Sequence, residues 1–200
     1  MEQVGRFVLA SASPRRREIL AQLGLRFQVL PSRVEERLLA GESPVDFAGR
    51  MAAEKADEVA RSLEKENQEA FILGADTVVV VDGDILGKPR GDSEACEMLY
   101  RLSGRWHEVI TAIALRRVNS GFRDHDVVST RVLFRPLDAP TIARYIESGE
   151  GRDKAGSYAI QGLGVGLVSQ IEGSYTNVVG LPATHTLAML MRAGLVLQWP

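Results

Sequence analysis

Short strand patterns alternate with helix patterns in the N-terminal part of the chain. The apolar run from Phe7 to Ala10 has the length of a strand, and apolar residues recur at helical spacing from Arg15 to Leu23, before Gly24. The run from Phe27 to Leu30 predicts a second strand. A longer helical pattern begins at Ser43-Pro44, a favourable N-cap and first residue, and continues to about Leu63.

Turn signals divide the middle of the chain. The apolar runs Phe71 to Leu73 and Val78 to Val81 flank the segment Gly74 to Thr77, which predicts a buried strand interrupted by polar residues. Asp82-Gly83 is a strong β-hairpin signal. The chain should therefore reverse there and continue into a short strand at Ile85-Leu86.

The C-terminal half continues the mixture of strands and helices. The stretch Gly149 to Gly166 is rich in glycine and charge and lacks periodicity, which predicts an ordered functional loop or a lid. Because some connections are helical and others are hairpins, we predict an α/β fold with a mixed central sheet flanked by helices. The remaining predicted elements are a helix over Ser93–Leu102, a strand pair over His107–Leu115 and Val127–Phe134, a helix from Asp138-Pro140 to Ser148, a strand pair over Val165–Ile171 and Asn177–Val179, and a helix from Pro182 to about Arg192.

Composition is that of an ordinary globular protein. The 200 residues are 45% hydrophobic and 25% charged, which predicts one domain over residues 1–200. The formal net charge of −2 provides no positive field to draw the chain onto a nucleic-acid polymer or an anionic membrane. No stretch approaches the roughly 20 apolar residues that span a bilayer. The single cysteine, Cys96, excludes an intrachain disulfide, so we expect a protein of the reducing cytoplasm.

The turn between the first strand and the first helix is one candidate site. The segment Ser11 to Arg17 places three arginines at a helix N-terminus, where backbone N–H groups and the helix dipole favour an anion. The structural alternative is that Ser13 caps the helix, Pro14 starts it and the arginines lie in solvent. Cations in a first turn are each unfavourable by about a few tenths of a kcal/mol, a cost that a bound anion would relieve.

Asp76 is a second candidate, because it lies with Thr77 in an otherwise apolar run. A carboxylate in a buried strand costs several kcal/mol unless it meets a cation, a metal ion or hydrogen-bond donors. The alternative is that Asp76 caps a turn, which the neighbouring Gly74 would permit.

Two later segments also carry candidate chemistry. In Gly87-Lys88-Pro89 the proline favours an extended conformation at Lys88, and the preceding hairpin would return this lysine to the edge of the sheet; a surface Lys-Pro turn is the alternative. The segment Asp153 to Gly164 holds both signs of charge and Gln161, whose amide offers a donor and an acceptor to the edge of a base. An exposed glutamine in a turn is the alternative. His107 and His185 lie beside apolar residues, and we assign them no catalytic role.

Taken in order, these segments resemble the Maf family of nucleotide pyrophosphatases. The resemblance covers nearly the whole chain, and Asp153 to Gly156 with Ile160 to Gly162 is similar to the dTTP/UTP type. It implies an α/β fold with two lobes around a cleft, similar to inosine triphosphate pyrophosphatases. It also implies hydrolysis of a nucleoside triphosphate to the monophosphate and pyrophosphate with Mg²⁺ or Mn²⁺. The matching segments are Ser11–Arg16, Gly74–Thr77, Gly87–Pro89, Asp153–Gly162 and Asn177–Pro182.

The resemblance also implies roles for individual residues. Asp76 matches the family's proton acceptor, and Glu36 with Asp76 would bind the metal, although the adjacent Glu35 offers a second carboxylate. Substrate specificity is assigned to Arg15, Thr77 and Gln161. The other implied substrate-binding residues are Ser11, Ser13, Arg16, Lys55, Lys88, Asp153 and Lys154.

Alternatives to this function stay open at the level of the sequence. One is a pyrophosphatase for modified purine nucleotides such as ITP or 7-methyl-GTP, and another is a nucleotide-sensing regulator of cell division or septum formation. The resemblance further implies a homodimer. Asp76 either takes the proton from water itself or chiefly holds the metal ion that activates the water.

Overall fold

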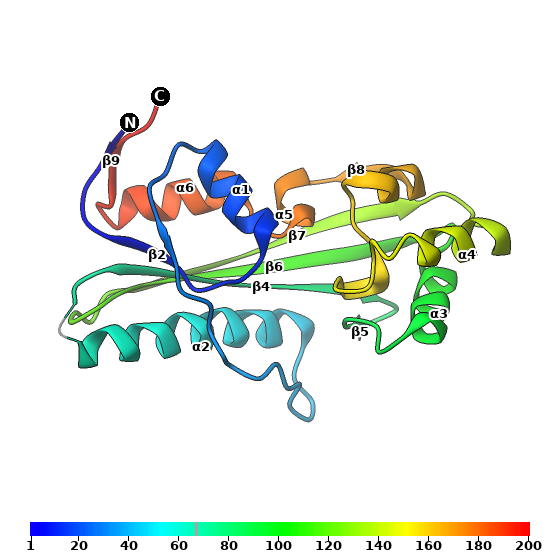
Figure 1. The fold of residues 1–200 in the computed structure, drawn as a ribbon, viewed down its shortest axis with the longest axis horizontal. Coiled ribbons are helices and arrows are strands. Elements are labelled where there is room, and N and C mark those ends of the chain that lie inside the picture. Colours follow the sequence, from blue (N-terminus) through cyan, green and yellow to red (C-terminus); the bar gives the residue numbers. More distant parts are fainter. Residues whose placement is uncertain (67) are drawn as a thin grey trace. The chain divides into compact units, whose positions relative to one another are not determined.

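The computed structural model describes residues 1–66 and 68–200, which form an α/β fold (Figure 1). Among these residues a seven-stranded sheet has the order β3-β2-β4-β6-β7-β8, with β5 paired to β4. Strand β2 pairs in parallel with β3 and β4, whereas β5 and β8 pair antiparallel with β4 and β7, so the sheet is mixed as predicted. Its strands are β2 (Phe7–Leu9), β3 (Gln28–Val29), β4 (Phe71–Val81), β5 (Asp84–Leu86), β6 (Trp106–Arg117), β7 (Arg123–Phe134) and β8 (Val168–Glu172).

Helices flank the sheet, as the sequence predicts. Three of them begin with a side-chain cap followed closely by proline: Ser13 caps α1, Ser43 caps α2 and Asp138 caps α4. The helices are α1 (Pro14–Gln22), α2 (Pro44–Lys65), α3 (Asp92–Leu102), α4 (Ala139–Glu147), α5 (Tyr175–Val179) and α6 (Ala183–Arg192), with the 3₁₀ turns η1 (Ala155–Ser157) and η2 (Gly162–Leu167). Of the helices formed by residues 1–66 and 68–200, none has the length and apolarity needed to span a bilayer.

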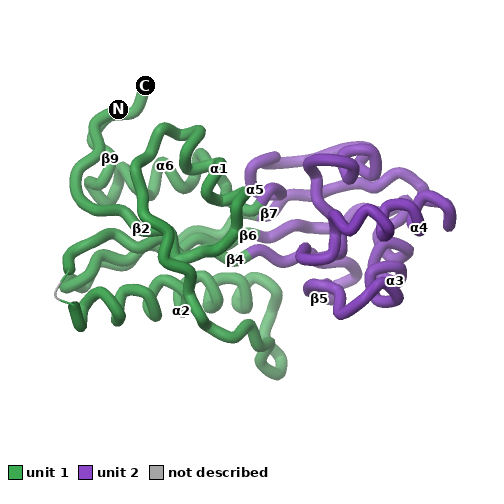
Figure 2. Tube along the Cα trace, in the orientation of Figure 1, with its two compact units in different colours: residues 1–76, 111–128, 180–200 green, residues 77–110, 129–179 purple. Residues whose placement is uncertain are grey.

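The chain divides into two compact units (Figure 2). Unit 1 comprises residues 1–76, 111–128 and 180–200, and unit 2 comprises residues 77–110 and 129–179. Strands β4, β6 and β7 contribute residues to both units, and β4 passes from one to the other after Asp76. The predictions of one domain over residues 1–200 and of two lobes around a cleft stay predictions.

Unit 1 has its own apolar core on both sides of the sheet, with α2 covering one side. On the other side of the sheet lie α1 and α6 (Figure 1). The fully buried side chains of this core include Leu9, Leu20, Met51, Ile72, Leu73 and Ile113.

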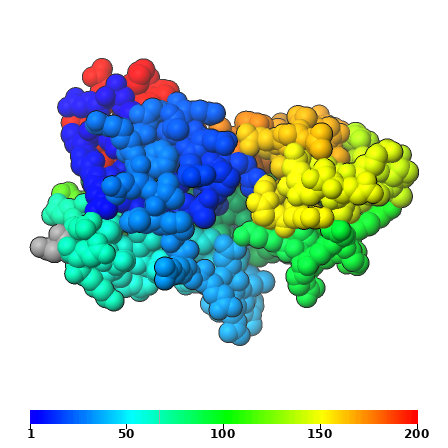
Figure 3. All heavy atoms as spheres, in the orientation of Figure 1, coloured from blue at the N-terminus to red at the C-terminus, as the bar shows by residue number. Residues whose placement is uncertain are grey.

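The two ends of the chain lie side by side in unit 1. Strand β1 (Glu2–Gln3) pairs antiparallel with β9 (Val196–Gln198), and both ends are seen together in the space-filling view (Figure 3).

The apolar core of unit 2 contains side chains of helices α3 and α4 and of strand β7. The two helices contact each other, and α3 also contacts the turn η1. The side chains that are almost wholly buried in this core include Leu99, Leu102, Phe134 and Ile142.

One predicted strand pair is wrong. Residues Asn177–Val179 belong to the helix α5, and β8 pairs with β7 instead. Ser174 Oγ accepts the backbone N–H of Asn177 at 3.2 Å, and the Asn177 amide donates to Val109 O and to Thr130 Oγ1, both at 2.9 Å. The hydrogen bonds to Val109 and Thr130 stabilise this segment as a helical turn. Its β-branched residues had favoured a strand.

Candidate active site

Helix α2 packs unusually close to strand β4 at Gly74. A Cβ atom at this position would lie 2.1 Å from Ala52 O and 2.8 Å from Ala56 N, so only glycine allows the helix backbone to approach this far. Because strand side chains alternate between faces, Asp76 projects to the same face as Gly74. The close approach therefore places Lys55, which lies between Ala52 and Ala56 on α2, beside Asp76.

Lys55 joins two carboxylates. Its Nζ donates to Asp76 Oδ1 and to Glu36 Oε1, each at 2.6 Å. Asp76 is 5% exposed and Lys55 8% exposed, whereas the Glu36 side chain is 44% exposed. The predicted cation beside Asp76 is therefore Lys55, and the alternative that Asp76 caps a turn is wrong because β4 is a continuous strand there. Of the two adjacent candidates, Glu36 is the carboxylate that pairs with Lys55.

Arg16 is the one arginine of the first turn of α1 that is buried. Its Nη1 donates to Ser11 Oγ at 3.1 Å and to Ala75 O at 2.9 Å, and its Nε donates to Gly180 O at 2.8 Å. Burial lowers the pKa of Arg16, and the nearby carboxylates of Asp76 and Glu36 oppose that shift. The guanidinium is thus fixed next to the Lys55–Asp76–Glu36 cluster with several of its donors committed.

The remaining residues of this turn are more accessible. Ser13 caps α1 by accepting the N–H of Arg16 at 3.5 Å. Arg15 is half-buried and close enough for its charge to lower the pKa of Arg16, whereas Arg17 is exposed. The structural alternative from the sequence, a serine cap with solvated arginines, is correct for Ser13 and Arg17 and wrong for Arg16.

The carboxylates suit a divalent cation only in part. Among residues 1–66 and 68–200, no group of three or more His, Cys, Asp or Glu side chains is arranged to hold a metal ion. Mg²⁺ is commonly held by one or two carboxylates together with substrate phosphates, so Glu36 and Asp76 fit that mode of binding and do not form a complete protein cage. Lys55 already binds one oxygen of each carboxylate, so the ammonium and a metal ion would share the same ligands.

In unit 2 the β4–β5 hairpin positions Lys88. The turn at Asp82-Gly83 forms as predicted, with φ values of 54° and 85°, and Val79 pairs with Leu86. The last observed pair of this hairpin is Val79 with Leu86. If the same register continued by two residues, Lys88 would lie opposite Thr77. Lys88 is exposed and Thr77 is half-buried.

The predicted functional loop is ordered by contacts with the same hairpin. Gly156 N donates to Gly87 O at 3.1 Å, and the Cα of Gly156 lies so close to Val79 that a Cβ would be 3.0 Å from Val79 Cγ1. Lys154 forms an ion pair with its neighbour Asp153. Unit 2 thus brings the Gly87-Lys88 segment and the loop of Asp153 and Lys154 together.

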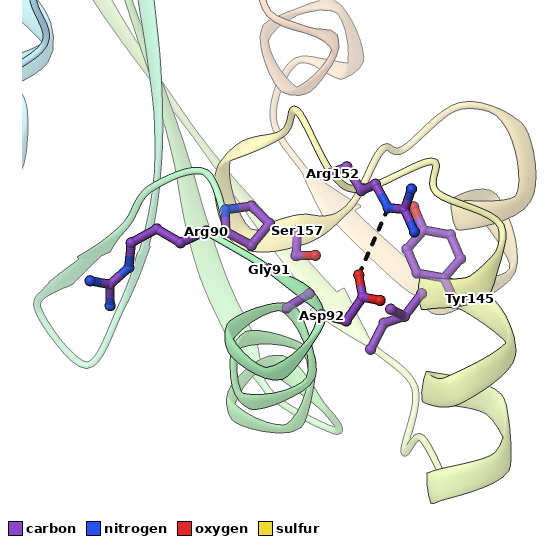
Figure 4. A pocket seen from close by; sticks show the side chains of 10 residues that line it. Arg90, Gly91, Asp92, Tyr145, Arg152 and Ser157 are labelled. Carbon is purple, nitrogen blue, oxygen red and sulfur yellow. Dashed lines mark ion pairs between the residues drawn. The ribbon is translucent and has the colours of Figure 1, made fainter.

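A pocket of about 250 Å³ lies next to this loop, at the start of α3 (Figure 4). Arg152 Nε faces Asp92 Oδ1 across it at 3.8 Å, and Tyr145 reaches it from α4. The buried Ser157 also lines it and adopts a positive φ of 58°. None of the predicted substrate-binding residues of unit 2 lines this pocket, although Pro89 and Arg152, next to Lys88 and Asp153 in the chain, do.

Two hydrogen-bonding groups of the site come from residues that sequence reasoning did not select. They are the carbonyl oxygens of Ala75 and Gly180, which accept from Arg16. A carbonyl carries no residue-specific signal. By contrast, the sequence does carry a signal that Arg16 turns inward. Arg16 precedes the buried Ile19 and Leu20 by three and four residues, so this charged residue lies on the apolar face of the helix.

His107 packs inside unit 2. Its Nε2 lies 2.8 Å from the Tyr158 hydroxyl, and its ring makes edge contacts with Phe134 and Tyr158. Burial lowers the pKa of His107 to about 4 and raises that of Tyr158. His185 is exposed and lies 2.8 Å from an oxygen of Asp126.

The pKa of His107 predicts a loss of stability in mild acid. Above the unfolded-state pKa of about 6.5 both states are neutral, but between about pH 6.5 and pH 4 the unfolded state binds a proton that the folded state does not. The free energy of unfolding should fall by up to about 3 kcal/mol across this window. Urea unfolding of the wild type and of His107→Leu at several pH values measures it. An equal pH dependence in both proteins would contradict the assignment.

Comparison with known proteins identifies the family. A family model described as Maf-like protein matches residues 6–193. A relative from Myxococcus xanthus named dTTP/UTP pyrophosphatase is 51% identical over 193 residues, covering 96% of this chain and 94% of the relative. Proteins of the same name from Anaeromyxobacter dehalogenans and Aquifex aeolicus are 49% and 41% identical, covering 97% and 96% of this chain and 97% of each relative. The chain belongs to the Maf-like protein family.

Solved structures give a weaker likeness. A HAM1 protein from Coxiella burnetii matches with a TM-score of 0.45 and 18% identity, over 95% of this chain and 100% of that chain. At this score the likeness supports no statement about the site.

Proposed function

We propose that this chain hydrolyses dTTP and UTP to the monophosphate and pyrophosphate. The observation that carries the proposal is the cluster in which the buried Lys55 joins Asp76 and Glu36 beside the anchored Arg16. A triphosphate needs cations to neutralise the charge that develops on the phosphates, and a carboxylate can accept the proton of the attacking water. The name shared by the curated relatives supports the same substrates.

Under this proposal the cations and the carboxylate divide the work. Arg15, Arg16, Lys55 and Lys88 hold the phosphates, and Asp76 receives the proton from water. Because Arg16 and Lys55 are held by fixed partners, their charges need little reorganisation when the substrate binds. The other residues proposed to contact the nucleotide are Ser11, Ser13, Thr77, Asp153, Lys154 and Gln161.

We further propose that Mg²⁺ or Mn²⁺ binds together with the nucleotide. Glu36 and Asp76 would hold the ion, whose chemistry is to neutralise phosphate charge and to lower the pKa of a bound water. Among the residues that the structure describes, no group of three or more ligand side chains forms, so affinity for the ion should be low until phosphate oxygens complete the coordination. The predicted homodimer and cytoplasmic location stay proposals as well.

A nucleotide panel tests the function directly. Purified protein is incubated with dTTP, UTP, CTP, ITP and 7-methyl-GTP, each with Mg²⁺ or Mn²⁺, and the products are separated. We expect dTMP or UMP with pyrophosphate, and the highest kcat/KM for dTTP and UTP. A diphosphate with inorganic phosphate would contradict the proposed bond cleavage, and binding without turnover would favour a nucleotide-sensing regulator. A preference for ITP or 7-methyl-GTP would overturn the assigned substrates.

A further inference from the structure

Glu150 binds the loop that carries Gln161. The residue lies just beyond the C-terminus of α4, and its carboxylate accepts two backbone N–H groups, that of Leu163 on Oε1 and that of Gly164 on Oε2, each at 2.8 Å. Both donors belong to the 3₁₀ turn η2, which follows Gln161 directly. One carboxylate thus fixes the backbone on the C-terminal side of Gln161 through charge-assisted hydrogen bonds.

Tyr145 extends the same contact to the other side of Gln161. This buried residue of α4 donates its hydroxyl to Glu150 Oε2 at 2.9 Å, and the hydroxyl oxygen accepts the N–H of Ala159 at 3.1 Å. Ala159 lies two residues before Gln161, and Leu163 two residues after it. The Tyr145–Glu150 pair therefore holds the backbone on both sides of Gln161 and leaves the Gln161 side chain, which is half-buried, outside these hydrogen bonds.

The glycines next to Gln161 are those that this arrangement requires. Gly162 has a φ of 64°, and a Cβ there would lie 1.9 Å from Glu150 Oε1. A Cβ on Gly164 would lie 1.9 Å from Ala159 O and 2.9 Å from the Tyr145 hydroxyl. A Cβ on Gly162 would displace the Glu150 carboxylate, and a Cβ on Gly164 would clash with the loop's own backbone at Ala159. Gly162 therefore leaves space for the Glu150 carboxylate, and Gly164 lets the loop pack closely on Ala159 and the Tyr145 hydroxyl.

We propose that Glu150 and Tyr145 are positioning residues that set the specificity of the enzyme by fixing Gln161 for contact with the base. This inference rests on the proposed function, in which Gln161 contacts the base of the substrate. The loop has little regular structure of its own, so without these hydrogen bonds the Gln161 amide would sample several orientations. Fixing it in advance removes an ordering cost from binding and gives the amide donor and acceptor defined directions.

Glu150→Gln is the sharpest test, because the amide keeps the shape of the carboxylate and loses one acceptor. The two backbone N–H groups bind different oxygens, so the amide nitrogen must face one of the two donors. We expect the ratio of kcat/KM for UTP to that for CTP to fall by about 10-fold, an effect of one lost hydrogen bond to a charged group. Taking a ratio cancels any loss that both substrates share, such as fewer folded molecules.

A double-mutant cycle separates positioning from a general structural role. If Glu150 acts through Gln161, Glu150→Gln should change the UTP-to-CTP ratio little once Gln161 is alanine. Tyr145→Phe, which removes only the bridging hydroxyl, should change the ratio in the same direction. Glu147→Gln is the matched control, because this glutamate is an exposed residue of the same helix. Thermal melts of every variant check that the chain is folded.

The outcomes distinguish this inference from the proposed function. If the wild type releases pyrophosphate from UTP and Gln161→Ala lowers the ratio, but Glu150→Gln and Tyr145→Phe leave it unchanged, the positioning role is wrong and the function stands. If the effects of Glu150→Gln and Gln161→Ala on the ratio simply add, Glu150 does not act through Gln161. If the wild type shows no pyrophosphate release from any nucleotide, the proposed function fails, and the inference fails with it.

Discussion

Replacing Asp76 with asparagine is expected to lower kcat/KM for dTTP by about 10²–10⁴-fold, the range for loss of a general base. The amide keeps the size of the side chain but has no negative charge and accepts no proton from water. Lys55 would keep its ion pair with Glu36, so the variant loses the Lys55–Asp76 ion pair but Lys55 stays anchored. The measurement is steady-state release of pyrophosphate, with a thermal melt to confirm that the variant folds.

The surface variant Asp84→Asn is the matched control for Asp76→Asn. Its carboxylate is 68% exposed and pairs with Arg101, so its replacement should leave kcat/KM unchanged. Near-normal turnover of Asp76→Asn would remove Asp76 from the chemistry.

A metal titration of Asp76→Asn separates the two roles left open for this residue. A loss of kcat that no concentration of Mn²⁺ restores would assign Asp76 to proton transfer. Partial recovery at high Mn²⁺ would assign it chiefly to metal binding, because a weakened site can be filled by mass action.

Gly74→Ala is expected to reduce stability by about 3 kcal/mol or more and to reduce activity with it. The added methyl group would lie 2.1 Å from the backbone oxygen of Ala52, and no side-chain rotation can relieve a clash with helix backbone. Helix α2 must therefore move away from β4, which lengthens the distance from Lys55 Nζ to Asp76. Urea unfolding gives the stability, and kcat/KM for dTTP reports the displaced lysine.

Gly49→Ala, on helix α2, is the control for Gly74→Ala. No atom lies within 4 Å of a Cβ built on Gly49, and alanine has the higher helix propensity, so this variant should be more stable by up to about 1 kcal/mol. If Gly74→Ala matched the wild type in stability and activity, the close packing of α2 on β4 would not be what places Lys55.

Local signals in the sequence were sufficient for most of the secondary structure. Ser13, Ser43 and Asp138 each cap the helix that the pattern predicts, and Asp82-Gly83 forms the expected hairpin turn. These predictions hold because caps and tight turns depend on a few neighbouring residues. The helix α5 was missed because the hydrogen bonds of Asn177 to Val109 and Thr130 come from residues far away in the chain.

The candidate site was predicted as a set of residue types, and its geometry was not. A carboxylate in an apolar strand requires a partner, so Asp76 could be selected from the sequence, but the identity of that partner could not. Lys55 stands on the buried face of α2 between Met51 and Val59, a pattern that local reasoning reads as part of the core stripe. Its role from the sequence came only from the resemblance to the Maf family.

By itself, the sequence determined that this protein is an α/β chain with a carboxylate in a buried strand and arginines at a helix start, because periodicity, caps and burial costs are local properties. Tertiary structure alone decided which cations turn inward and what they contact. Lys55 meets Asp76 because Gly74 admits the backbone of α2, and Glu150 meets the Gln161 loop because Gly162 leaves space for its carboxylate. Each contact depends on how separate segments of the chain pack against each other in space, which no local pattern encodes.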